Sequence, residues 1–265
     1  ILALMSGSVL AGTVVTLDQS INGEPVRQQT IELTADKVKM TSPENQMIYR
    51  GDQNKVWIVK PEDKAYVELT AESMSQMKAR MDQGLAMMQQ RMASLPPEQR
   101  KQVEAMMAAR GMGSGTPSAP PQITYEKAGD PKKINGYTCT PFHVTMTTGA
   151  PPSEFCMAAL SDLGLSRDDL KAFVGFGKFM SQMGGTGAQR SPMAQLDFDS
   201  IKQQIGFDAF PVQTSFSVPG GQRAVQTTLK SVRHEDPPAG TFDLPAGYTR
   251  QDMGAGMGHG PRAPG

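Results

Sequence analysis

The chain has 265 residues, and its 26 lysines and arginines balance 26 aspartates and glutamates, so its formal net charge is zero. A neutral chain lacks the basic surface with which nucleic-acid-binding proteins displace counterions and with which peripheral proteins hold anionic membranes. We therefore expect neither nucleic acid nor a membrane surface as its partner.

The first twelve residues, 1–12, form an apolar run that ends in small residues. Such a run is typical of the end of a secretory signal peptide, and we interpret it as the remnant of one. The alternative is that it begins an N-terminal strand. No later apolar run reaches the roughly 18 residues that a membrane-spanning helix needs, so we expect no integral membrane segment.

Residues 13–69 alternate between apolar and polar side chains in short runs that are separated by turn signals such as Asn22-Gly23. Runs of this kind, about ten residues apart, predict an antiparallel meander with one buried face. The six strands are expected at 13–17, 28–33, 37–41, 46–49, 55–59 and 65–69.

The pattern becomes helical after Thr70, which we interpret as a helix N-cap. Five of the 19 methionines, Met74, Met77, Met81, Met88 and Met92, fall on one face of this helix. A second helix is expected to end near Arg110, which makes residues 70–110 a helical insertion. The Gly- and Pro-rich residues 111–121 are expected to be a flexible linker.

Strands resume in the second half of the chain, at 122–125, 136–146, 154–158, 212–218, 223–232 and within 241–249. Ser166 and Asp169 resemble a capping box, which predicts a third helix with a broad apolar surface that includes Phe173, Phe176 and Met180. Residues 196–205 are either a short helix or a loop.

The order of these elements predicts a single α+β domain over residues 13–250, with a sheet of about ten or eleven strands. The helices stand between two blocks of strands. Residues 251–265 are rich in Gly and are expected to be a disordered tail.

The two cysteines, Cys139 and Cys156, lie in neighbouring predicted strands that are joined by a turn. In an exported protein a cross-strand disulfide is the favoured interpretation. Two alternatives remain open at this point: free thiols, and a zinc site that would add His143, although the Cys-x3-His spacing is not a common structural-zinc pattern. We expect no metal.

Several segments together resemble a family of exported bacterial proteins that is known as a domain of unknown function. The segments are Gln46–Asp52, Val56–Val59, Lys64–Thr70, Leu95–Gln99, Ile134–Cys139 and Phe242–Tyr248. The family is similar in architecture to the lipoprotein carrier LolA. The resemblance implies a curved, half-open antiparallel barrel whose concave apolar face is covered by helices, in a bacterial periplasmic or secreted protein. The family has no established active site whose residues could be assigned to this chain.

The inventory of chemically active residues argues against an enzyme. The sequence has no Gly-x-Ser-x-Gly elbow, no His-Glu-x-x-His motif, no Walker loop and no Cys-x-x-Cys motif. We therefore expect no catalytic residues and no cofactor.

The methionines carry the main functional hypothesis. Methionine fills irregular gaps, so the helix face could simply be packed on the sheet, or it could be a movable lid over a cavity for an apolar ligand. The favoured hypothesis is a carrier for an apolar small molecule or for the acyl chain of a lipid or lipoprotein. The predicted cavity lining comprises Trp57, Met74, Met77, Met81, Met88, Phe173, Phe176 and Met180.

Two alternatives remain beside the carrier hypothesis. One is a non-enzymatic envelope chaperone or interaction module with a filled core. The other is Cu(I) binding by the thioethers of Met74, Met77 and Met81, which have a workable helical spacing.

Overall fold

The structure, a computed structural model, describes residues 12–24, 27–93, 122–147, 151–181, 197–217 and 224–251. The predicted signal remnant (except Gly12), the second helix, the linker 111–121 and nearly all of the tail lie outside these residues. The chain divides into two compact units, one of Ile1–Thr70 with Ile123–Gly265 and one of Ala71–Gln122. The single-domain prediction stays a prediction.

The first half of the larger unit is the expected meander. It comprises β1 (Thr13–Ile21), β2 (Arg27–Leu33), β3 (Lys37–Thr41), β4 (Gln46–Arg50), β5 (Lys55–Lys60) and β6 (Ala65–Thr70), with a 3-10 turn η1 (Gly51–Gln53) after β4. Each strand pairs antiparallel with the next one in the chain. Asn22 and Asn54 take up the positive φ angles of 54° and 48° that their turns require.

The second half adds the remaining strands. They are β7 (Ile123–Lys127), β8 (Lys132–Ile134), β9 (Tyr137–Met146), β10 (Ser153–Ala159), β11 (Ala209–Ser217), β12 (Ala224–His234) and β13 (Thr249–Arg250), with a 3-10 turn η2 (Leu160–Leu163) after β10. The two halves join where β12 pairs antiparallel with β1. The strand order is β13-β6-β5-β4-β3-β2-β1-β12-β11-β10-β9-β7, with β8 paired to β9.

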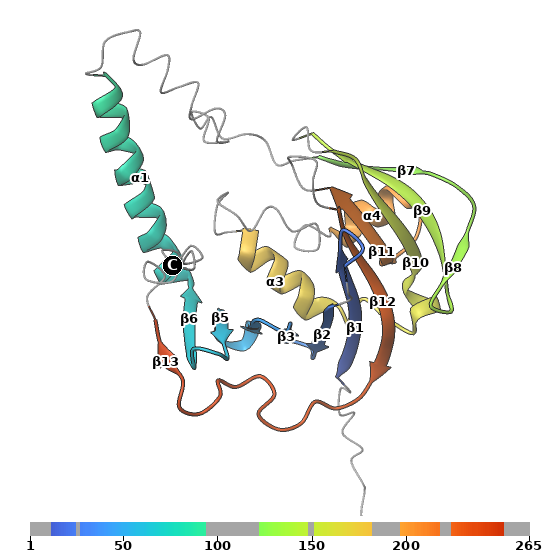
Figure 1. Cartoon of the computed structure of the whole chain (residues 1–265), viewed down its shortest axis with the longest axis horizontal. Helices are drawn as coiled ribbons and strands as arrows, with labels where there is room; N and C mark the ends of the chain where they lie inside the picture. Colours follow the sequence, from blue (N-terminus) through green and yellow to red (C-terminus); the bar gives the residue numbers. More distant parts are fainter. Residues whose placement is uncertain are drawn as a thin grey trace, which may run out of the picture. The chain divides into compact units, whose positions relative to one another are not determined.

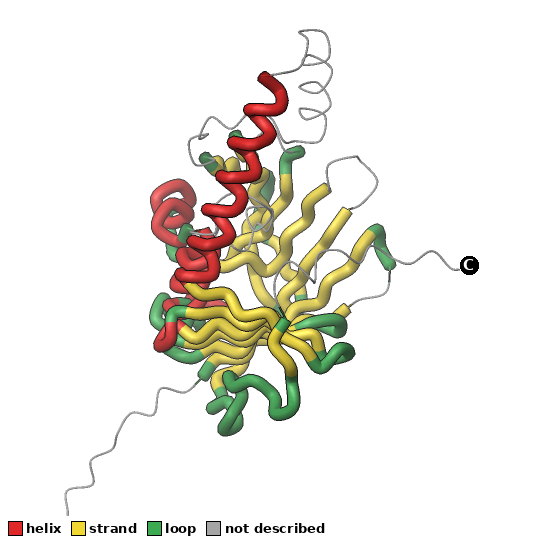
Figure 2. Tube along the Cα trace, turned by 90° about the vertical axis from the view of Figure 1, so that its left-hand side faces the viewer, coloured by secondary structure: helices red, strands yellow, loops and turns green. Residues whose placement is uncertain are grey.

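The described sheet therefore has thirteen strands, whereas the sequence predicted about ten or eleven. The strands not predicted are β8 and β13, which have three and two residues and are too short to show an alternating pattern. Residues 241–248, expected within a sheet element, form turns, and only Thr249–Arg250 pairs, in parallel, with β6. The result is an open, curved and mostly antiparallel sheet (Figures 1 and 2).

Two described helices belong to the same unit as the sheet. They are α3 (Lys171–Ser181) and α4 (Phe198–Ile205); the latter resolves the ambiguity at 196–205. Helix α4 begins at Asp197, whose side chain accepts hydrogen bonds from the N–H groups of Asp199 and Ser200. Helix α3 packs on β3 and lies inside the curve of the sheet (Figure 1).

The smaller unit contributes α1 (Ala71–Ala93), which follows β6 directly in the chain and begins where the helical pattern predicts it. None of the described helices is long and apolar enough to cross a membrane. That helices together cover the concave face of the sheet stays a prediction.

Candidate ligand-binding face

Tyr49 identifies the sheet face on which α3 packs, here called the α3 face. Its ring centroid lies 5.7 Å from that of Phe176 and 5.9 Å from that of Phe179. Gly175 allows this approach, because a Cβ atom there would lie 3.2 Å from the Tyr49 hydroxyl. Burial, and then the nearby charge of Asp36, raise the pKa of Tyr49, so its hydroxyl stays neutral. The aromatic contacts hold α3 against the sheet.

One row of side chains on the α3 face, here called the closed row, is fully buried. Direct cross-strand pairs connect its five members, and all five are buried. They are Leu33, Val38, Tyr49, Val56 and Leu69. This row is the core between α3 and the sheet.

The next row on the same face is apolar but less deeply buried. It follows the register from Ile31 through Met40, Met47 and Ile58 to Val67. Ile31 and Val67 are buried, whereas Met40, Met47 and Ile58, here called the half-buried row, are only half-buried. Three strands with a spacing of about 4.8 Å give this row a length of roughly 10 Å. Its three central side chains are therefore apolar and keep part of their surface accessible.

Sequence reasoning missed Met40 and Met47. It assigned functional methionines to the helices alone, although a signal in the strands was available. Met40 lies two residues from Val38 on one strand, and Met47 lies two residues from Tyr49 on the next. Residues two apart in a strand point to the same side, so each methionine shares a face with a core residue.

Three of the predicted lining residues, Phe173, Phe176 and Met180, belong to α3. Phe173 and Phe176 are buried, with ring centroids 6.5 Å apart, and Met180 is half-buried at the end of the helix. Their role in binding stays a prediction. Of these three residues, Phe176 contacts Tyr49 on the α3 face, and Phe173 contacts Phe176.

Trp57 lies on the opposite face of the sheet. Its neighbour Val56 pairs with Tyr49, and successive residues of a strand point to opposite sides. Trp57 instead forms a buried cluster with Ile48, Val59 and Phe242. The structure therefore separates Trp57 from Phe173 and Phe176.

Polar contacts also hold Trp57 on that face. Its indole N–H donates a hydrogen bond of 2.9 Å to Glu68, and the ammonium of Lys55 lies 4.4 Å from the ring centroid. Glu68 also pairs with Arg250 of β13 at 3.0 Å. These contacts fasten the C-terminal segment to the sheet.

The predicted methionines of α1 belong to the other unit. Met74 is buried and Met88 is half-buried, whereas the side chains of Met77 and Met81 lie outside the described residues. Both the cavity-lining role of these four residues and the Cu(I) alternative therefore stay predictions.

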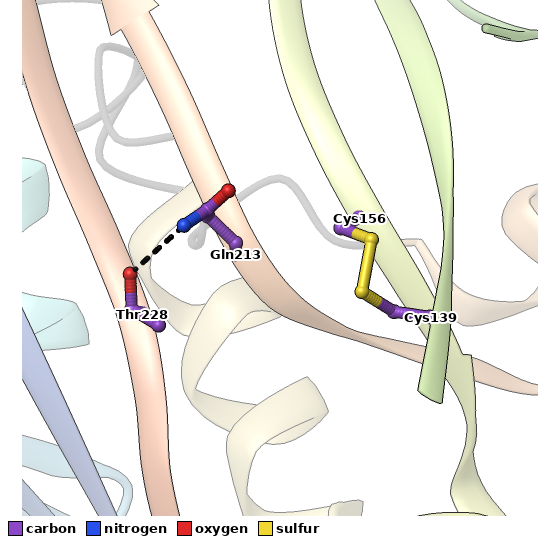
Figure 3. Close-up of a disulfide and its surroundings, with 4 residues drawn as sticks. All are labelled: Cys139, Cys156, Gln213 and Thr228. Carbon is purple, nitrogen blue, oxygen red and sulfur yellow. Dashed lines mark hydrogen bonds between the residues drawn. A yellow bond between two sulfur atoms is a disulfide. The ribbon is translucent and has the colours of Figure 1, made fainter. Parts of the chain in front are cut away.

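Cys139 and Cys156 form a disulfide between β9 and β10 (Figure 3). The disulfide prediction is confirmed, and the free-thiol and zinc alternatives are wrong, because both sulfur atoms are bonded to each other. Within the described part of the chain, no group of three or more His, Cys, Asp or Glu side chains could hold a metal ion.

A polar pocket of about 340 Å³ lies on the face opposite α3. It is lined in part by Lys37, Arg50, Phe242 and Asp243. The guanidinium of Arg50 forms ion pairs with Asp52 at 2.7 Å and with Asp243 at 2.9 Å. The hydrogen bond from Arg50 is the largest influence on Asp52 and lowers its pKa, so the pair stays charged. Arg50 is thus already neutralised and clamps the C-terminal segment.

Residues 72–248 match a family model described as a domain of unknown function, DUF4412. The chain belongs to this family. The resemblance seen in the sequence is confirmed to that extent, and no curated protein matches the chain.

Solved structures similar to this DUF4412 protein include an uncharacterized conserved protein from Thermus thermophilus, with 6% identity, a TM-score of 0.44 and coverage of 92% of this chain and 91% of that one. A putative outer membrane lipoprotein-sorting protein domain from Vibrio parahaemolyticus has 8% identity, a TM-score of 0.29 and 86% coverage of each chain. A DUF1329 family protein from Desulfovibrio piger has 9% identity, a TM-score of 0.31 and coverage of 89% and 91%. Likenesses this distant carry no conclusion about function.

Proposed function

We propose that this protein is a non-enzymatic, extracytoplasmic carrier that binds an apolar ligand, such as an alkyl or acyl chain, on the α3 face. The observation that carries the proposal is the half-buried row. Met40, Met47 and Ile58 continue the apolar pattern of the core, yet they keep part of their surface accessible. Each methylene of a ligand removed from water there contributes about 0.8 kcal/mol. Thioethers adapt to ligands of different shape.

The disulfide supports the proposed location. Disulfides persist in oxidising compartments such as the bacterial periplasm and are rare in the cytosol. The Cys139–Cys156 bond therefore agrees with the apolar, signal-like residues 1–12.

The closed row supports the alternative of a filled interaction module, since α3 already packs there. Ligand binding separates the two hypotheses. We expect wild-type protein to bind decanol in isothermal titration calorimetry and Met47→Gln to bind it roughly tenfold more weakly, because the polar amide opposes burial of the chain. Met47→Leu is the control and should bind as the wild type does.

A wild-type protein that binds neither decanol nor longer neutral chains would reject the carrier and favour the interaction module. Binding that is equal in Met47→Gln and wild type would place the ligand elsewhere. The cavity-lining role predicted for the methionines of α1 is a separate proposal, and Met88→Gln tests it in the same assay.

A further inference from the structure

Charge is almost absent from the α3 face of the first six strands. Among the described residues of these strands, alternation places only two charged side chains on that face, Arg27 on β2 and Lys60 on β5. Arg27 is neutralised by an ion pair with Glu44. Of these two described side chains, Lys60 is therefore the one without an ion pair.

Lys60 has no partner among the residues that the structure describes. It is half-buried, and its ammonium group makes no ion pair or hydrogen bond with a residue that the structure describes. The nearest acidic residues in sequence, Glu62 and Asp63, are exposed in the turn that follows β5. A half-buried lysine lays its aliphatic stem on apolar surface and extends its charge from it.

The position of Lys60 relates it directly to the half-buried row. Lys60 follows Ile58 by two residues on the same strand and the same face, a distance of about 7 Å along β5. An apolar row of roughly 10 Å thus ends beside one uncompensated cation. A neutral ligand leaves this cation unused, and a cationic ligand is repelled by it.

We propose that the ligand is a single-chain fatty carboxylate, with its alkyl chain along Met40, Met47 and Ile58 and its carboxylate at Lys60. This inference rests on the proposed carrier function and names its ligand class. The ammonium supplies a charge-assisted hydrogen bond to the carboxylate, and the apolar row supplies most of the affinity. In the polar pocket on the other face, Arg50 is already paired with two carboxylates.

The test compares three probes that share a ten-carbon chain: decanoate, decanol and decyltrimethylammonium, each titrated calorimetrically at neutral pH below micelle formation. Wild-type protein is expected to bind decanoate about three- to tenfold more tightly than decanol, and decyltrimethylammonium least tightly. Lys60→Gln should bring decanoate to the level of decanol and leave decanol unchanged. Lys60→Met should weaken decanoate while decanol binding is kept or strengthened, which a misfolded variant cannot do.

Lys37→Gln is the matched control. Lys37, on β3, is also half-buried, but it lies on the opposite face of the sheet. It should leave the preference for decanoate intact. Equal binding of decanoate and decanol by the wild type, or an unchanged preference in Lys60→Gln, would overturn this inference while the carrier function stands. Absence of binding for all three probes would overturn both.

Discussion

At the scale of single residues, alternation along a strand decides which side chains share a face, whatever their hydrophobicity. Trp57 and Ile58 are adjacent and apolar, yet Trp57 packs with Phe242 while Ile58 lies on the α3 face. Since Trp57 is the only tryptophan of the chain, its fluorescence reports on the C-terminal segment rather than on the half-buried row.

Tyr125 shows what burial does to a single ionisable group. Its ring contacts Phe155 at 6.5 Å, and burial, with a smaller contribution from Asp197, raises its pKa to about 12. The unfolded chain forms tyrosinate first, near pH 10, so the free energy of unfolding falls as pH rises from 10 to 12. Below pH 10 this residue adds no pH dependence.

We therefore expect the free energy of unfolding of the wild type to fall by up to about 1.4 kcal/mol per pH unit between pH 10 and 12 through Tyr125 alone. Tyr125→Phe should lack this component. Urea unfolding at pH 9, 10 and 11 measures the difference between the two proteins. Parallel curves for both would show that Tyr125 ionises equally in the folded and unfolded states.

At the scale of elements, α3 is fixed by the turn that precedes it. The Asp169 carboxylate accepts hydrogen bonds from the N–H and hydroxyl groups of Ser166, at 2.7 and 2.6 Å, and from the buried hydroxyl of Thr13 at 3.1 Å. The capping box that the sequence predicts is confirmed, and its additional bond to Thr13 ties α3 to β1. Burial raises the pKa of Asp169, but the hydrogen bonds from Ser166 and Thr13 and the charge of His234 outweigh it and lower the pKa.

Asp169→Ala should lower the free energy of unfolding by about 1–2 kcal/mol at pH 7, because it removes the cap and the hydrogen bond from Thr13 to Asp169. The stabilisation by Asp169 is present above the usual carboxyl pKa near 4 and is lost as pH falls through the lowered pKa of the folded state. Urea unfolding at pH 7 and pH 3 measures both effects.

Asp168→Ala is the matched control for this prediction, since Asp168 is the exposed neighbour of Asp169. Equal losses in the two variants would show that the cap does not anchor α3.

At the scale of the whole molecule, the chain itself occupies part of each edge of the described sheet. Strand β13 covers β6 at one edge, with Thr249 N–H donating to Lys64 and Gln251 N–H to Tyr66. At the other edge the amide of Gln204, on α4, accepts from Tyr125 N–H and donates to the Ile123 carbonyl, at 3.1 and 2.9 Å. Gln204 therefore occupies positions on β7 where a further strand would pair.

Gln204→Ala should expose these backbone groups of β7 and promote concentration-dependent self-association by strand pairing. Sedimentation velocity over a range of protein concentrations measures it. Gln203→Ala, the change of an exposed neighbour on the same helix, should behave as the wild type does. A Gln204→Ala protein with unaltered sedimentation would show that the side chain does not protect this edge.

The sequence by itself determined the local features of this protein. Alternating patterns placed most strands within a few residues, and turn and capping signals placed Asn22, Ser166 and Asp169. The spacing of Cys139 and Cys156 favoured the disulfide that the structure contains. These features depend on neighbours close in the chain, which a pattern records.

Only the tertiary structure decided which strands and faces meet. The pairing of β1 with β12 joins residues more than 200 positions apart, and no local pattern encodes it. Alternation shows that Trp57 and Ile58 point to opposite sides, but only the packing of α3 on Tyr49 shows which side is which. The half-buried row and the position of Lys60 beside it follow from that choice of face, because burial is a property of the packed sheet rather than of a strand.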